Sequence, residues 1–213
     1  MEGLKELYDA IVTGNAKSAK ALTENALAEG VDAQVLIDKY MIPAMDEVGR
    51  LFEANEYYVP ELLISARAMK ASLQLIRPLL TAKGSEPQGR VAIGTVKGDL
   101  HDIGKNLVSA MLEGGGFEVI DLGVDVPPEK FIAAIQEKKA TVVAMSALLT
   151  TTMLSMKTTI DALQNAGVRN RVKIMIGGAA VTQRYADEIG ADGFSDNANS
   201  AVALARRLVA AQA

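Results

Sequence analysis

The stretch VAIGTVKGDLHDIG, residues 91–104, carries the strongest fold signal in this chain of 213 residues. It opens with an apolar run at 91–95 whose Val and Ile residues are typical of a buried strand. A polar loop follows at 96–104, and helical spacing of apolar residues begins near Ile103. The order predicts a strand, a loop and a helix. In α/β proteins, ligands bind on loops of this kind at the carboxyl ends of parallel strands.

The same alternation of strand-like and helical stretches continues to the end of the chain. The strand-like runs lie at 91–95, 118–122, 141–146, 172–176 and 193–195, and glycines close the helical stretches between them. Strands separated by helices indicate right-handed βαβ units and a parallel sheet covered on both faces. Residues 90–213 are therefore predicted to form a flavodoxin-like (Rossmann-type) α/β domain with five parallel strands.

Residues 1–81 follow a different period, because their apolar side chains recur every three or four positions. The clearest series is Leu62, Ala66, Met69, Leu73 and Ile76. Such spacing predicts amphipathic helices, and four of them joined by short loops form a helix bundle.

Two prolines and a polar segment mark boundaries in this region. Pro43 predicts a kink or break in a third helix over 33–54, and Pro78 is expected to end or kink the fourth. Residues 82–89 (AKGSEPQG) are rich in turn formers and predict a linker between the bundle (1–81) and the α/β domain (90–213).

Composition excludes several classes of function. The net charge of −4 gives no support for nucleic acid as a partner, and the lack of cysteine excludes disulfides and thiolate chemistry. With a single histidine, a structural zinc site is not expected. Neither an export signal nor an apolar run of about 20 residues is evident, so we expect a cytoplasmic soluble protein without a membrane partner.

The only histidine, His101, lies in the first polar loop with Asp99 two positions before it. An imidazole whose second nitrogen is held by a carboxylate is a common metal ligand. Each residue also has a simpler explanation, since a lone histidine is often a surface residue and Asp99 could cap the following helix.

Two further segments are expected at the same edge of the sheet. The loop after the third strand holds hydroxyl side chains over 146–152, and the fourth strand ends in Gly177 and Gly178. Hydroxyls often cap helices and paired glycines often form turns, so neither segment is specific alone. The first loop does not resemble a flavin phosphate loop, the dinucleotide and triphosphate motifs are absent, and Ser146 stands where a receiver domain has its aspartate.

Taken together, the three segments resemble the signature of cobalamin-binding domains: Asp99-x-His101-x-x-Gly104, Ser146-x-Leu148 and Gly177-Gly178. The resemblance implies that His101 is the lower ligand of cobalt in a base-off/His-on state, with Asp99 as its hydrogen-bond partner. It further implies that Ser146 meets the nucleotide tail of the cofactor and that the paired glycines make room for it.

The resemblance assigns three more residues to the same cofactor site: Asp102, Leu148 and Thr150. Thr152 stands six positions after Ser146, where methionine synthase has a serine that completes the His–Asp relay. Its hydroxyl suits the relay, but its extra methyl group alters the geometry.

The first half resembles the cap domain of methionine synthase, through MDEVGRLF at 45–52, YVPEL at 58–62 and SARAMK at 65–70. The resemblance implies that Phe52, Val59 and Leu62 cover the upper face of methylcobalamin. Ordinary bundle core is the simpler explanation, and it is favoured for Leu62.

Both halves together resemble the small corrinoid proteins of one-carbon metabolism in methanogens and acetogens. The resemblance implies a non-catalytic methyl carrier with no catalytic residue beyond the cofactor. Its expected partners are a substrate-specific methyltransferase for an O-methyl, N-methyl or methanol-type donor, a second methyltransferase using tetrahydrofolate or coenzyme M, and a reductive activator. The alternatives are a cobalamin-dependent sensor or regulator and the cobalamin-binding subunit of an adenosylcobalamin mutase.

Overall fold

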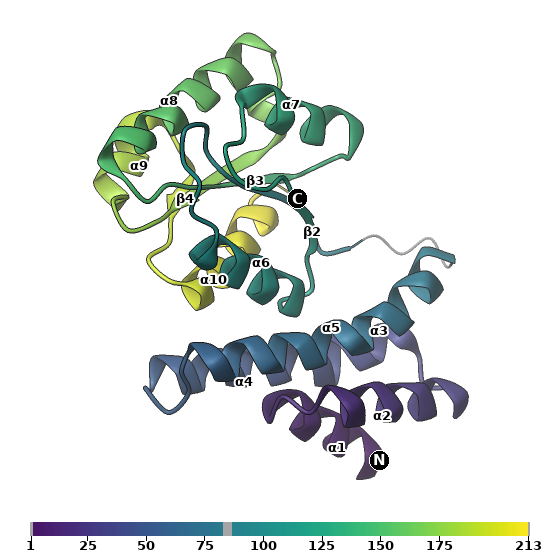
Figure 1. Cartoon of the computed structure of the whole chain (residues 1–213). Coiled ribbons are helices and arrows are strands. Elements are labelled where there is room, and N and C mark those ends of the chain that lie inside the picture. The colour runs from purple at the N-terminus through teal and green to yellow at the C-terminus, as the bar shows by residue number, and fades with distance from the viewer. Residues whose placement is uncertain (1, 83–86, 213) are drawn as a thin grey trace. The chain divides into compact units, whose positions relative to one another are not determined.

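The computed structural model describes residues 2–82 and 87–212, which fold into one helical and one α/β unit (Figure 1). The predicted linker therefore falls partly on residues 83–86, which lie outside the described residues. Within the described ranges, no helix is long and apolar enough to span a membrane.

The helical unit confirms the predicted bundle. Its elements are α1 (Glu2–Val12), α2 (Ala16–Ala28), α3 (Ala33–Leu36), the π-helical segment η1 (Ile37–Met41), α4 (Ile42–Glu53) and α5 (Val59–Ala82). The periodic apolar residues form the core, and Leu7, Ile11, Met69 and Ile76 have no exposed surface. Burial of each such side chain contributes about 1.5–3 kcal/mol, which is why the spacing determines the helices.

The two prolines are accommodated in ways the sequence pattern did not specify. Helical structure continues through Pro43, because the π-turn directly before it lets the Ile42 N–H reach the Ile37 carbonyl. Pro43 then lies in the first turn of α4, where no proline N–H is needed. The prediction that a helix could end at Pro78 is wrong, since α5 runs on to Ala82. A proline removes one hydrogen bond of this long helix, and the remaining turns maintain it.

The α/β unit confirms the predicted parallel sheet. Its strands are β1 (Arg90–Thr95), β2 (Glu118–Asp121), β3 (Val142–Ser146), β4 (Lys173–Gly177) and β5 (Gly193–Phe194), in the order β2-β1-β3-β4-β5. All neighbouring strands are parallel. Thr95 pairs with Ser146, and Ser146 with Gly177, so three strands end in line and their loops share one edge.

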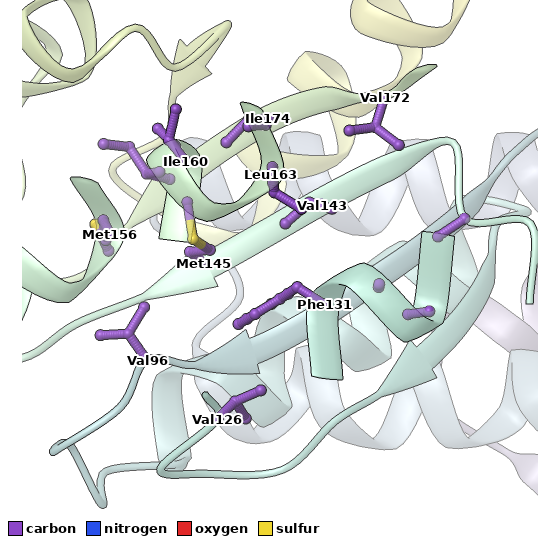
Figure 2. Packing of buried hydrophobic residues seen from close by; sticks show 14 of the residues in the cluster. Val96, Val126, Phe131, Val143, Met145, Met156, Ile160, Leu163, Val172 and Ile174 are labelled. Carbon is purple, nitrogen blue, oxygen red and sulfur yellow. The ribbon is translucent and has the colours of Figure 1, made fainter. Parts of the chain in front are cut away.

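Helices cover both faces of the sheet (Figure 1). One face carries α6 (Ile103–Gly114) and α10 (Ala198–Ala210), and the other carries α7 (Pro128–Glu137), α8 (Thr150–Asn165) and α9 (Gln183–Ile189). A short 3-10 turn, η2 (Arg169–Arg171), precedes β4. Phe131 and Met156 are fully buried between the sheet and its helices, and Val96 and Val126 belong to the same cluster (Figure 2). Because Val96 follows β1 and Val126 follows β2, the loops at the carboxyl edge are anchored in the core.

Candidate functional site

The loop between β1 and α6 brings Asp99 and His101 together. The His101 Nδ1 lies 2.6 Å from Asp99 Oδ1, and the backbone N–H of His101 also donates to that oxygen, at 3.2 Å. Asp99 is only 3% exposed. Since an ionised carboxylate can only accept, Nδ1 carries the hydrogen and Nε2 of the neutral ring is left as the acceptor nitrogen.

The second oxygen of Asp99 is held by the loop after β3. Thr152 Oγ1 donates to Asp99 Oδ2 at 2.6 Å, and the Leu148 N–H donates to the same oxygen at 2.8 Å. The extra methyl group of Thr152 therefore does not prevent a hydroxyl–carboxylate–imidazole chain. Burial by itself raises the pKa of Asp99, but the hydrogen bonds from Thr152, His101 and Leu148 outweigh it and hold the pKa well below its ordinary value.

The outer nitrogen of the imidazole has a partner that the sequence did not reveal. His101 Nε2 lies 2.9 Å from Ser146 Oγ, and in the tautomer with its hydrogen on Nδ1 this nitrogen accepts the hydroxyl hydrogen. The pairing of Thr95 with Ser146 explains this contact, because it places the end of β3 beside the start of the His101 loop. A hydroxyl can rotate away from the ring, so this contact leaves Nε2 available to a metal.

The glycines differ in why the chain requires them. A Cβ at Gly178, whose φ is +122°, would lie 2.0 Å from the Ala147 carbonyl oxygen, and one at Gly177 would lie 3.0 Å from the Ser195 carbonyl oxygen. The fold itself thus excludes a side chain at Gly178, whereas at Gly177 it leaves a methyl group only a tight fit against the Ser195 backbone. A Cβ at Gly104 would meet nothing within 4 Å, so the packing of the chain does not explain this glycine. Its bare backbone leaves open space beside α6.

The other residues predicted for the site differ in whether they contact the chain Thr152–Asp99–His101. The Asp102 carboxylate accepts from Asn106 Nδ2 at 3.2 Å and its carbonyl from the Asn106 N–H, so Asp102 serves the start of α6. Thr150 is exposed at the first position of α8. Leu148 supplies its N–H to Asp99 while its side chain is 45% exposed.

The three predicted cap residues lie in the helical unit, with unequal exposure. Val59 is 41% exposed and Phe52 is half-buried, whereas Leu62 has no exposed surface. Full burial of Leu62 is what ordinary bundle packing produces. Phe52 and Val59 have surface with which to contact a ligand.

Exposed apolar side chains lie on the two loops that meet at the imidazole. Leu100 and Ile103 flank His101 with 75% and 83% exposure, and Leu148 and Leu149 follow β3 with 45% and 53%. Large exposed apolar residues gathered in one place are typical of a binding site. Within the described ranges, no three His, Cys, Asp or Glu side chains are placed to hold a metal ion. One held imidazole, an apolar rim and open space at Gly104 fit a metal that brings its other ligands in a macrocycle.

The sequence pattern missed several groups that hold this loop. Thr95 Oγ1 donates to the His101 carbonyl at 2.7 Å, and Ser155 Oγ donates to the Lys97 carbonyl at 2.9 Å. Thr95 is the last residue of a strand and Ser155 lies one turn into a helix, positions where hydroxyl side chains are common. Only the three-dimensional arrangement shows their targets.

Comparison with known proteins covers both units. A B12 binding domain model matches residues 89–203, and a second B12 binding domain model matches residues 4–77. The trimethylamine corrinoid protein of Methanosarcina barkeri is 44% identical over 95% of this chain and 94% of its own length. A chain of the methanol:cobalamin methyltransferase complex MtaBC from Methanosarcina barkeri matches 98% of this chain and 80% of its own, with TM-score 0.87 and 31% identity. A cobalamin-binding protein from Desulfitobacterium hafniense DCB-2 matches 96% of this chain and 98% of its own, with TM-score 0.78 and 34% identity.

Proposed function

This chain belongs to the corrinoid proteins, a family with two B12-binding domains, and from that premise we propose that it carries a methyl group between two methyltransferases. The observation that carries the proposal is the chain Thr152–Asp99–His101, which leaves Nε2 of the only histidine facing a single rotatable hydroxyl. The bound corrinoid supplies a cobalt centre that accepts and releases the methyl group.

In this proposal His101 is the lower ligand of cobalt, in the base-off/His-on state. Asp99 fixes the tautomer and direction of the ring, as carboxylates do behind metal-bound histidines. Thr152 and the Leu148 N–H hold the carboxylate in turn. With cobalt on Nε2, the Ser146 hydroxyl would no longer bond the ring and would be available to the nucleotide tail.

The rest of the site binds and shields the cofactor. We assign the space beside Gly104 and the apolar rim of Leu100, Ile103 and Leu148 to the macrocycle. In the helical unit, Phe52 and Val59 are assigned to the upper face. Residues 1–81 then act as a cap.

The names of the related proteins support the choice of partners. Relatives are named for trimethylamine and dimethylamine, and one similar structure is a methanol:cobalamin methyltransferase complex. We therefore propose a substrate-specific methyltransferase for a methylamine-type or methanol-type donor. A second methyltransferase passes the methyl group to tetrahydrofolate or coenzyme M, and a reductive activator restores oxidised cofactor. The relatives favour this carrier role over the sensor and mutase alternatives.

The test is ligation of cobalt by the imidazole. The protein and its His101→Ala variant are reconstituted with hydroxocobalamin and reduced to Co(II). EPR of the wild-type protein should show superhyperfine coupling from one nitrogen, and the variant should lack it. A Gln183→Ala variant is the matched control, because Gln183 contacts Asp187 on α9 and not the ring; it should keep the coupling. Coupling that persists in His101→Ala shows that the tail base is still bound and contradicts the proposal.

A further inference from the structure

The loop that carries His101 is held from two sides, and the cobalamin signature accounts for only one. Because β1 lies between β2 and β3, the loop after β1 has a neighbour on each side. The β3 side supplies the bonds from Leu148, Thr152 and Ser155 described above. The β2 side is the segment Leu122–Val126 and contains none of the signature residues.

Asp125 in that segment contacts the His101 loop through two bonds. The Gly98 N–H donates to Asp125 Oδ1 at 2.7 Å, and the Asp125 N–H donates to the Asp99 carbonyl at 2.9 Å. The segment is also bonded to the end of β1. The Val126 N–H donates to the Thr95 carbonyl at 2.9 Å, and Val96 forms a parallel bridge with Val126. Figure 2 shows Val96 and Val126 close together in the core.

The backbone of Asp125 indicates that this arrangement is maintained at some cost. Its φ is +50°, in the left-handed region that L-residues rarely adopt. Aspartate, asparagine and glycine tolerate this region best. Gly98, its partner, also has a positive φ, of +86°. The unusual conformation of Asp125 thus lies at the point where the two loops are bonded to each other, a pattern typical of functional loops.

We infer that Asp125 is a positioning residue for the cobalt-binding histidine. Its side chain and backbone hold the peptide groups at Gly98 and Asp99, which fixes the backbone from which the Asp99 carboxylate reaches the ring. The inference rests on the proposed function, since it takes His101 as the cobalt ligand. It adds the loop after β2 as a further wall of the site.

Two substitutions separate the hydrogen bond from the backbone conformation. Asp125→Gly adopts a positive φ without strain but removes the acceptor for Gly98. Asp125→Asn also tolerates the conformation and keeps an oxygen acceptor. We expect Asp125→Gly to bind hydroxocobalamin about tenfold more weakly, as is typical when an outer partner of a metal ligand is lost. Asp125→Asn should stay within about twofold of the wild type, because its acceptor remains.

A measurement without cofactor tests the contact itself. In the cofactor-free protein, exchange of the Gly98 amide hydrogen should be slow in the wild type and Asp125→Asn, and faster in Asp125→Gly. A fast-exchanging Gly98 amide in the wild type overturns the inference even if Asp125→Gly does not fold. Wild-type affinity in Asp125→Gly overturns it as well.

The same experiment distinguishes this inference from the proposed function. If the wild-type protein shows nitrogen coupling from His101 and Asp125→Gly binds equally well, only the positioning role fails. If the wild type shows no such coupling, the assignment of His101 itself fails, whatever Asp125 does.

Discussion

Thr152 is the residue that keeps the carboxylate behind the imidazole in place. Its hydroxyl donates to Asp99 Oδ2 at 2.6 Å and is buried. Thr152→Val has nearly the same shape but no donor, so it should lower the unfolding free energy of the cofactor-free protein by about 1.5–3 kcal/mol, the usual cost of losing a hydrogen bond to a charged group. Thr152→Ser keeps the donor and should lose less than half of that.

Denaturant unfolding of the two variants beside the wild type measures the difference. Equal stability of Thr152→Val and the wild type would show that the Leu148 N–H alone satisfies this oxygen. Thr152→Val should also raise the pKa of Asp99, because the hydrogen bond from the Thr152 hydroxyl, which lowers that pKa, is gone.

Two glycines of the signature should respond to alanine in opposite ways. At Gly178 a methyl group meets the Ala147 carbonyl in a backbone conformation closed to alanine, so Gly178→Ala should cost at least about 3 kcal/mol of unfolding free energy. At Gly104 a methyl group meets nothing, and Gly104→Ala should add up to about 1 kcal/mol, because alanine favours a helix.

The effect of Gly104→Ala on cofactor binding should differ from its effect on stability. If the space beside Gly104 takes the macrocycle, Gly104→Ala should bind hydroxocobalamin more weakly although it is no less stable. Thermal or denaturant unfolding and a binding titration on the same preparation check both statements. Unchanged binding by Gly104→Ala contradicts the placement of the cofactor there.

At the scale of elements, a buried lysine fastens the first turn of α6 to the end of β2. The Lys105 side chain is 2% exposed, and its ammonium group donates to both oxygens of Asp121 at 2.7 Å. The Asp121 side chain is 45% exposed and also accepts from the Gly123 N–H at 2.9 Å. The two partners of this ion pair therefore have unequal access to water.

This difference in exposure predicts which substitution lowers the unfolding free energy more. Asp121→Asn leaves the buried ammonium group without a counterion and should cost about 3 kcal/mol or more. Lys105→Met leaves a carboxylate that water can reach and should cost about 1 kcal/mol. Denaturant unfolding of both variants tests the order, and a larger loss for Lys105→Met would show that packing of the lysine stem outweighs its charge.

Apolar periodicity predicted the elements because burial determines them. The spacing of Leu62, Met69 and Ile76 was sufficient for α5, and the run at 91–95 for β1. The apolar spacing could not predict how the helical hydrogen bonds accommodate a proline. The π-turn before Pro43 and the continuation of α5 past Pro78 are the two examples. These outcomes depend on neighbouring turns rather than on the proline itself.

The site was predictable where a side-chain type is rare and not where it is common. His101 is the only imidazole, and Asp99 stands at a fixed spacing from it. Lys105, Asp121 and Asp125 are charged residues of ordinary kinds in and around loops, so nothing in the sequence separates them from solvated surface. Their roles arise from the order β2-β1-β3, which brings the loop after β2 against the His101 loop.

At the scale of the whole molecule, a carrier has to protect its methyl group and also release it. If Phe52 covers the upper face of the cofactor, Phe52→Ala should speed photolysis of the methyl–cobalt bond severalfold while corrinoid affinity stays nearly unchanged. Phe52→Leu is the control, because it keeps most of the apolar cover. Unaltered photolysis together with a loss of stability of about 3–5 kcal/mol would make Phe52 an ordinary core residue.

The engagement of both nitrogens of His101 has a practical consequence. Because the chain contains one histidine, growth on isotopically labelled histidine marks a single imidazole and nothing else. Its two ring nitrogens have different partners, Asp99 and Ser146, and therefore two distinct signals. Only the signal of the nitrogen facing Ser146 should change strongly when that partner is exchanged for a metal. The signal of this nitrogen therefore reports whether metal is bound to the intact protein, and it can be read in a mixture with unlabelled enzymes.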